Sequence, residues 1–289
     1  MSAPTLQTAP TTTTLRTART RHYAMCPPTH FDVVYAINPW MHPGTPVDVD
    51  RALSQWAGLV AVFESLGHRV DVLPPTPGLP DMVFAANGAT VVDGRALGAS
   101  FAHAERRAEA DLHAGFLAGL GIEVHRPQHV NEGEGDFAVA GDWLLAGTGF
   151  RTSTAAHAEA QELFGRPVVT LHLVDPRFYH LDTCLTVLDD LHGQATVAWY
   201  PPAFSAGSQA VVRTLFPDAV EATEADALAF GLNAVSDGRH VVLPQQARQL
   251  AADLAARRFE PIGVDLSELL AAGGSVKCCT QELRARRSG

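Results

Sequence analysis

The fold is decided by the stretch NAVSDGRHVV, residues 233–242, in which two short apolar runs flank an Asp-Gly pair. An Asp-Gly pair between such runs favours a tight two-residue turn, so the stretch predicts a β-hairpin. Related patterns occur at residues 90–97, 137–145 and 185–197, with turns near residues 93, 142 and 192. Together with the turn near residue 238, these turns are separated by 49, 50 and 46 residues, which indicates an internal repeat.

Each predicted hairpin is followed by a helical segment and then by a short apolar strand. The clearest helix begins at Ser153 or Thr154, whose hydroxyl can cap it, reaches Phe164 and ends at Gly165. Further helices are predicted at 102–120, 205–216 and 245–257 and from Asp48 or Asp50 to Gly67, and the strands that follow helices include 69–73, 122–124 and 168–171. The first unit lacks a hairpin, which we expect residues 33–37 and 275–283 to form together.

These elements predict an α/β fold of five strand–strand–helix–strand units, closed into a ring by the two ends of the chain. Spacing alone leaves an ordinary doubly wound α/β sheet as an alternative. We expect one catalytic domain at residues 25–289, preceded by a flexible tail at residues 1–24. The beginning of that tail is rich in Thr, Ala and Arg and contains no acidic residue through residue 20, so a transit peptide is a second interpretation.

Composition restricts the class of protein. The net charge is -10 and no basic stripe is present, which argues against a nucleic-acid binder. No apolar run is long enough for a membrane span, and no signal-peptide core follows the N-terminus. Four cysteines, Cys26, Cys184, Cys278 and Cys279, do not make a disulfide framework in a chain of this length, so we expect free thiols in the cytoplasm.

Polar residues recur near the first strand of each unit, and in a ring such equivalent positions converge on the axis. They are Asn38, Asn87, Glu134 with Asp136, His180 with Asp182, Asn233 and Cys278, at steps of 49, 47, 46, 53 and 45 residues. Carboxylates hold a planar cation by paired hydrogen bonds, a thiolate attacks carbon, and a histidine transfers the proton. The set therefore predicts a cysteine-dependent reaction on a small cationic substrate, without a cofactor.

Each of these residues also has a simpler interpretation. Cys278 can be a small core residue, since free cysteine is often buried, and Glu134 and Asp136 can be solvated turn residues between glycines. A zinc site built from Cys278, Cys279, His180 and Asp136 is a further alternative, but the ligand spacings typical of zinc are missing. We therefore expect no metal.

Four segments, in order along the chain, resemble the guanidino-group modifying superfamily of arginine deiminases, amidinotransferases, dimethylargininases and arginine dihydrolases. They are DMVFAAN at 81–87, EGEGD at 132–136, FYHLDT at 178–183 and GGSVKCCTQEL at 273–283. The resemblance runs from about residue 25 to residue 283. It implies the same fold, a five-unit α/β propeller of the pentein type with repeated ββαβ units.

The resemblance also implies roles for the recurring residues. Cys278 would attack the guanidinium carbon to form a covalent thiouronium-type intermediate, and His180 would protonate the departing amine and then activate water. Glu134, Asp136 and Asp182 would hold the guanidinium nitrogens, although Glu132 competes with Glu134 for the active carboxylate. Arg106 is either a ligand of the substrate carboxylate or a solvated helix residue, and Asn38, Asn87 and Asn233 are expected to contact substrate.

Asn38 and Asn87 together look most like the arginine dihydrolases, which convert arginine to ornithine, carbon dioxide and two ammonia molecules. Asp182 suits a guanidinium with free N–H donors, so we expect arginine in preference to dimethylarginine. Dimethylargininase, deiminase or amidinotransferase activity, and from another class a non-catalytic arginine-binding protein, remain the alternatives. A small molecule is the expected partner, with a homo-oligomer possible and neither nucleic acid nor membrane expected.

Overall fold

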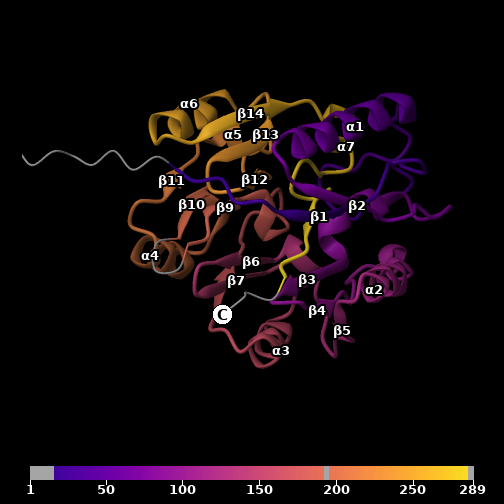
Figure 1. The fold of residues 1–289 in the computed structure, drawn as a ribbon, viewed down its shortest axis with the longest axis horizontal. Helices are drawn as coiled ribbons and strands as arrows, with labels where there is room; N and C mark the ends of the chain where they lie inside the picture. Colours follow the sequence, from indigo (N-terminus) through magenta and orange to yellow (C-terminus); the bar gives the residue numbers. More distant parts are fainter. Residues whose placement is uncertain (1–15, 192–194, 286–289) are drawn as a thin grey trace, which may run out of the picture.

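Five three-stranded sheets surround a common centre, with the longer helices on the periphery (Figure 1). The computed structural model describes residues 16–191 and 195–285. Four sheets follow the chain in order: β3 (Ala89–Val92), β4 (Arg95–Gly98) and β5 (Glu123–His125); β6 (Phe137–Ala140), β7 (Trp143–Thr148) and β8 (Val168–His172); β9 (Leu185–Asp189), β10 (Thr196–Trp199) and β11 (Val220–Glu221); β12 (Val235–Ser236), β13 (His240–Pro244) and β14 (Glu260–Val264). In each of these sheets the first pair of strands is antiparallel and the second pair is parallel.

The remaining sheet joins the two ends of the chain. It contains β15 (Gln281–Glu282), β1 (His22–Met25) and β2 (Arg69–Val72), with β1 antiparallel to β15 and parallel to β2. The sheets confirm the predicted five-unit ring and exclude the doubly wound alternative. One detail was wrong, because residues 33–37 form no strand and β1 pairs with the C-terminal strand instead.

The strand β1 also corrects the predicted tail at residues 1–24. Residues 1–15 of that tail lie outside the described part of the chain, but β1 begins at His22. Ahead of it, Arg19 forms ion pairs with Asp189 and Asp190. The predicted boundary at residue 24 is therefore too late.

Local sequence signals explain where the helices begin and end. The helices are α1 (Val49–Ser65), α2 (Glu109–Gly119), α3 (Thr154–Phe164), α4 (Ala206–Leu215), α5 (Glu224–Leu228), α6 (Arg248–Ala256) and α7 (Ser267–Leu270). The Ser153 side chain accepts a hydrogen bond from the Ala156 amide at the start of α3, and Gly165 ends that helix at a φ of 61°. The helix predicted from residue 102 begins only at Glu109, after the short 3-10 turn η3 (Ala104–Arg106).

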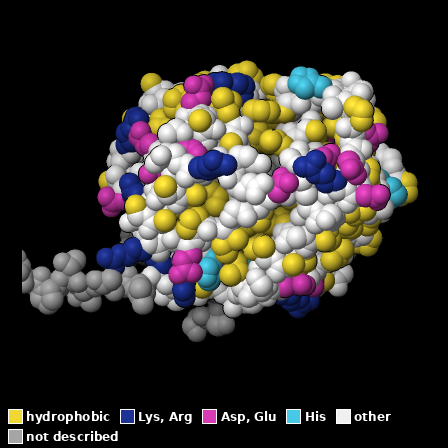
Figure 2. Space-filling model, turned by 90° about the horizontal axis from the view of Figure 1, so that it is seen from above, with side chains coloured by type: hydrophobic (Ala, Val, Ile, Leu, Met, Phe, Trp, Pro, Cys, Tyr) yellow, Lys and Arg dark blue, Asp and Glu magenta, His cyan; other side chains and the backbone are white. Residues whose placement is uncertain are grey.

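Short 3-10 turns place the polar residues at the centre of the ring. The turns η2 (Ala85–Gly88), η4 (Gly133–Gly135) and η5 (Leu181–Thr183) each lead into the first strand of a sheet, and η1 (Pro80–Val83) and η6 (Pro201–Ala203) lie elsewhere. The apolar core fills the space between sheets and outer helices and includes the fully buried Trp199. The face in Figure 2 shows Lys and Arg side chains beside Asp and Glu side chains, not gathered into one basic patch. None of the described helices combines the length and the apolar composition needed to cross a membrane.

A buried carboxylate strengthens the junction between the first and last sheets. Asp237 Oδ2 lies 2.7 Å from His240 Nδ1 and 3.4 Å from His68 Nε2, and Oδ1 accepts hydrogen bonds from two backbone amides of its own turn. Burial alone would raise the pKa of Asp237, but these hydrogen bonds hold it well below its usual range. The carboxylate is therefore ionised, and its charge stabilises the folded chain.

Asp237→Asn is expected to lower the free energy of unfolding at pH 7 by roughly 2–4 kcal/mol, because a partner of a buried charged cluster is lost. A carboxylate with a lowered pKa contributes stability above its unfolded pKa of about 3.9 and loses that contribution as the pH falls. The difference between wild type and variant in urea denaturation should thus shrink below about pH 4. A difference that stayed constant down to about pH 3 would contradict this assignment.

Candidate functional site

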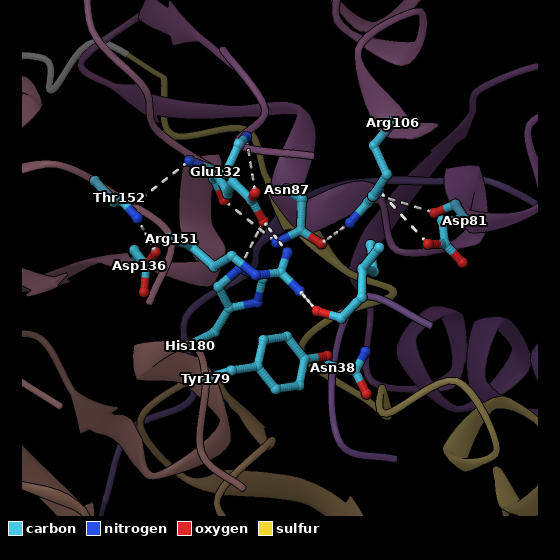
Figure 3. Close-up of polar contacts among 12 residues, drawn as sticks. Asn38, Asp81, Asn87, Arg106, Glu132, Asp136, Arg151, Thr152, Tyr179 and His180 are labelled. Carbon is cyan, nitrogen blue, oxygen red and sulfur yellow. Dashed lines mark hydrogen bonds and ion pairs between the residues drawn. The ribbon is translucent and has the colours of Figure 1, made fainter. Parts of the chain in front are cut away.

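Four of the recurring polar residues, Asn38, Asn87, His180 and Cys278, meet in a small cavity at the centre of the ring. Figure 3 shows the first three of them with their polar neighbours. The cavity is lined by Ile37, Asn38, Asp81, Phe84, Asn87, Arg106, Arg151, Tyr179, His180, Ala272 and Cys278. These side chains come from segments that are far apart in the sequence, so the site exists only when the ring is closed. Of the predicted site residues, Asn38, Asn87, Arg106, His180 and Cys278 line it directly.

Cys278 lies against an asparagine and a carboxylate. The Asn233 side chain donates from Nδ2 to the Cys278 sulfur at 3.1 Å and accepts the Cys278 amide through Oδ1, also at 3.1 Å. The sulfur lies 3.2 Å from Asp182 Oδ2. Burial and the nearby Asp182 charge raise the pKa of the Cys278 thiol well above its usual value. Without a ligand the residue is thus a thiol, and a cation beside it would favour the thiolate.

Asp182 has one oxygen available to a ligand. Its Oδ1 is buried and has no hydrogen-bond partner among the described residues, although Oδ2 contacts the Cys278 thiol. Burial raises the pKa of Asp182 to about 6, against the opposing charges of His180 and Lys277. A buried carboxylate oxygen without a partner carries a desolvation cost that an N–H donor would relieve. The position is therefore suited to a guanidinium.

His180 is oriented by Glu132. Its Nε2 lies 2.8 Å from Glu132 Oε2, whereas Nδ1 is buried and has no partner in the described part of the chain. Glu132 also accepts the Ala102 amide through Oε1. Burial would raise the pKa of Glu132, but the His180 hydrogen bond and the charges of His180 and Arg151 hold it well below its usual range. An ionised carboxylate on one ring nitrogen leaves the other free to exchange protons with a ligand.

Arg151 is a site residue that sequence reasoning missed. Its guanidinium binds Glu132 Oε2 at 2.8 Å and the Ile37 carbonyl at 2.6 Å, and lies 4.9 Å from the Tyr179 ring centroid (Figure 3). It follows β7 rather than preceding the first strand of a sheet, so it falls outside the repeated positions. Tyr179 and Asp81 also line the cavity, and the only signal for them was their place inside the resembling segments.

Three acidic residues predicted to hold the guanidinium, Glu134, Asp136 and Asp182, are not among the residues that line the cavity. Asp182 adjoins it through its contact with the Cys278 sulfur, whereas the other two are bound elsewhere. Glu134 binds Lys277 Nζ at 2.5 Å, the Glu282 amide at 2.9 Å and the Arg284 guanidinium. Asp136 accepts the backbone amides of Leu181 and Thr152. The sequence left open whether Glu132 or Glu134 is the active carboxylate. The geometry favours Glu132, because Glu132 is the carboxylate that contacts His180.

Arg106, Asn38 and Asn87 line the cavity and are bound to buried polar groups around it. Arg106 is 3% exposed, so it is no solvated helix residue, and it binds Glu109 Oε2 at 2.7 Å and Asn87 Oδ1 at 2.7 Å. The Nδ2 atoms of Asn87 and Asn38 donate to the carbonyls of Glu132 and Ala272. Among the described residues, no group of three or more His, Cys, Asp and Glu side chains is arranged to hold a metal ion.

Comparisons with known proteins agree with this geometry. Residues 45–285 match the model of a family described as N,N dimethylarginine dimethylhydrolase, eukaryotic. The chain is 54% identical to the N(G),N(G)-dimethylarginine dimethylaminohydrolase of Mycobacterium tuberculosis, over 93% of this chain and 87% of that protein. It is 37% identical to the bifunctional arginine dihydrolase/ornithine cyclodeaminase ArgZ of Synechocystis, over 89% of this chain and 37% of that protein.

The fold is shared with a solved relative. The crystal structure of the N-terminal domain of ArgZ bound to product superposes with a TM-score of 0.87 at 35% identity, and covers 92% of this chain and 98% of that domain. The match therefore extends over most of the ring. With a family model that covers residues 45–285 and a relative 54% identical over most of both chains, this chain belongs to the N,N-dimethylarginine dimethylhydrolase family of guanidino-group modifying proteins.

Proposed function

We propose that the chain is a cysteine hydrolase that attacks the guanidinium carbon of L-arginine and proceeds to ornithine, ammonia and carbon dioxide. Hydrolysis of a guanidino C–N bond is common to the relatives, and the chain is a hydrolase of this kind. The observation that carries the proposal is the contact between Cys278 and Asp182, whose second carboxylate oxygen is buried and has no partner within residues 16–191 and 195–285.

In the first half of the reaction, the guanidinium binds Asp182 and lies against the Cys278 sulfur. Its positive charge offsets the Asp182 charge that raises the pKa of the thiol, so binding favours the thiolate. A C–S bond forms as the bond from carbon to one nitrogen breaks. The proton lost from the thiol reaches the departing nitrogen through His180, whose Nε2 is held by Glu132.

In the second half, water attacks the carbon of the thiouronium intermediate and His180 accepts its proton. The C–S bond then breaks, the thiol recovers a proton, and citrulline is the first product. We propose that a second round on the ureido carbon follows before release, in which the Cys278 sulfur displaces the second ammonia and forms a thiocarbamate. Water then breaks the C–S bond, and the carbamate that is freed loses carbon dioxide to give ornithine. The amide nitrogens of Asn38 and Asn87 support retention, because each donates one of its two N–H groups to a backbone carbonyl. No second acceptor for either nitrogen is found among the described residues, so the other N–H can serve a ureido oxygen.

Dimethylarginine is the second candidate substrate. The Mycobacterium tuberculosis relative favours it, because it is 54% identical to this chain and is named for that activity. The argument for arginine is that two methyl groups remove the N–H donors from one nitrogen and enlarge it within a cavity that is already small. The two candidates share the nucleophile and the histidine and differ in the leaving group.

Product analysis separates the two. Purified protein incubated with arginine should give ornithine and ammonia, and Cys278→Ser should give neither, because it lacks the thiolate. Mass spectrometry identifies the products, and asymmetric dimethylarginine is tested in parallel. Citrulline as the sole product from arginine would contradict the second round of hydrolysis. Faster turnover of dimethylarginine than of arginine would identify dimethylarginine as the preferred substrate.

The pH dependence should report Asp182. Because a guanidinium is held by the ionised carboxylate, kcat/KM for arginine should rise with pH through about 6, the pKa of Asp182 in the free enzyme. Asp182→Asn should remove this acidic limb and lower kcat/KM at pH 8 by roughly 10- to 150-fold, since a charged hydrogen bond contributes about 1.5–3 kcal/mol. An unchanged acidic limb in the variant would assign it to another group.

Glu132→Gln should lower kcat by about 10²–10⁴-fold, because His180 loses the charge that orients it and stabilises its protonated form. The amide can still occupy the position between His180 and Arg151, so the fold should be retained. Steady-state kinetics at saturating substrate measure the effect, with circular dichroism as the check on folding. A kcat within about threefold of wild type would exclude Glu132 from proton transfer.

A further inference from the structure

The turn that carries Cys278 is held from three neighbouring parts of the ring. In the segment that precedes β12, the Asn233 carbonyl accepts the Lys277 amide at 3.2 Å, in addition to the contacts of the Asn233 side chain with Cys278. From η2, the Ala86 amide donates to the Cys278 carbonyl at 3.0 Å. The third support is Glu134, which is 2% exposed and does not line the cavity.

Glu134 binds the segment on both sides of the nucleophile. Lys277, which immediately precedes Cys278, donates from Nζ to Glu134 Oε2 at 2.5 Å. The Glu282 amide donates to the same oxygen at 2.9 Å, and the Arg284 guanidinium pairs with Oε1. Lys277 Nζ also binds the Thr280 carbonyl at 2.9 Å, which closes the turn on itself. One buried carboxylate thus fixes both ends of the segment that contains Cys278.

Glu134 lies in the short turn η4, and Glu132, the residue that orients His180, is the N-cap of the same turn. Glu132 and Glu134 flank Gly133, whose φ of 54° favours glycine. A Cβ atom on Gly133 would lie 2.7 Å from the Ala86 carbonyl oxygen and 2.8 Å from the Ala89 amide nitrogen, so the turn packs directly on backbone. Because Glu132 and Glu134 are two residues apart on this fixed turn, the position of His180 and that of Cys278 are set by one element.

We propose that Glu134 is a positioning residue, which acts through its ion pair with Lys277 to hold Cys278 in line with the His180–Glu132 pair. This inference rests on the proposed function only in taking Cys278 as the nucleophile. Lys277 contributes a second effect, because its charge opposes the rise in the pKa of Asp182 that burial causes. If the contacts of Glu134 only stabilised the fold, there would be no reason for them to fall on the residues that flank the nucleophile.

The test compares Glu134→Gln and Lys277→Met, singly and together, with Asp237→Asn as the matched control. Asp237 is also a buried carboxylate with basic partners, but it lies at the junction of the first and last sheets, and its hydrogen-bond and ion-pair partners in the described part of the chain are not cavity residues. Each single variant of the pair should lower kcat by about 10- to 100-fold with KM within about threefold, because the loss is one of alignment. The double variant should be no worse than the more affected single variant.

A second measurement does not depend on turnover. Alkylation of Cys278 by iodoacetamide, followed by peptide mass spectrometry below the unfolding temperature, reports how tightly the turn holds its buried thiol. Cys278 should be alkylated at least about fivefold faster in Glu134→Gln than in Asp237→Asn, although the kcat of Glu134→Gln is lower. In Lys277→Arg, which keeps the charge, the alkylation rate and kcat should stay closer to those of wild type than in Lys277→Met. Because Lys277 is partly exposed, Lys277→Met keeps the test available if Glu134→Gln fails to fold.

The two proposals fail in different ways. If neither arginine nor dimethylarginine is turned over by wild type, the proposed function is wrong, while the alkylation rates still decide the role of Glu134. If kcat and the alkylation rate of both variants match those of Asp237→Asn, and only thermal stability falls, Glu134 is a structural residue and the positioning role is overturned.

Discussion

The antiparallel pairing of β1 with β15 joins the first and last parts of the chain, and the site depends on it. The pairing is short, with Tyr23 opposite Glu282 and Ala24 opposite Gln281. Two backbone pairs are a weak attachment by themselves, so neighbouring side-chain contacts are needed to stabilise the pairing. Arg21 forms ion pairs with Glu282 and Asp190, and Glu134 accepts a hydrogen bond from the Glu282 amide. Cys278 lies three residues before β15, and closure of the ring therefore brings the nucleophile to the cavity.

Charge within the closed ring follows one physical rule, that a buried ion needs a partner. Glu132 is satisfied by His180 and Arg151, Arg106 by Glu109, and Glu134 by Lys277 and Arg284. Asp182 and Asp81 are less completely satisfied, since Oδ1 of each has no partner in the described residues and burial raises the pKa of both. A carboxylate oxygen that lacks a hydrogen-bond donor thus lies close to the Cys278 sulfur, and a guanidinium could supply that donor.

The three carboxylates of the acidic turn at residues 132–136 have different partners, although the sequence left the choice between Glu132 and Glu134 open and assigned Asp136 to the guanidinium. Glu132 faces His180, Glu134 faces the C-terminal segment, and Asp136 accepts backbone amides near η5. The division follows from Gly133, whose positive φ turns the backbone sharply between the two glutamates. Spacing two residues apart would place both glutamates on one face of a strand, but the turn is a 3-10 element.

The sequence by itself determined the repeat, the helix ends and most of the residues that meet at the centre. Hairpin turns such as Asp93-Gly94 and caps such as Ser153 depend on local backbone preferences, which a single segment expresses without the rest of the chain. Asn87, His180, Asn233 and Cys278 were found because equivalent positions of a ring converge, whatever the details of packing.

Only the tertiary structure decided which strand closes the ring, which glutamate faces His180, and that Arg151 belongs to the site. Residues 33–37 and 22–25 are both short and partly apolar, and the pairing with β15 selects the second through contacts more than 250 residues apart. Arg151 reaches Glu132 and the Ile37 carbonyl across the cavity, which no local pattern encodes. Long-range pairing and the direction of a side chain are set by the closed ring as a whole, because each depends on surfaces that several distant segments form together.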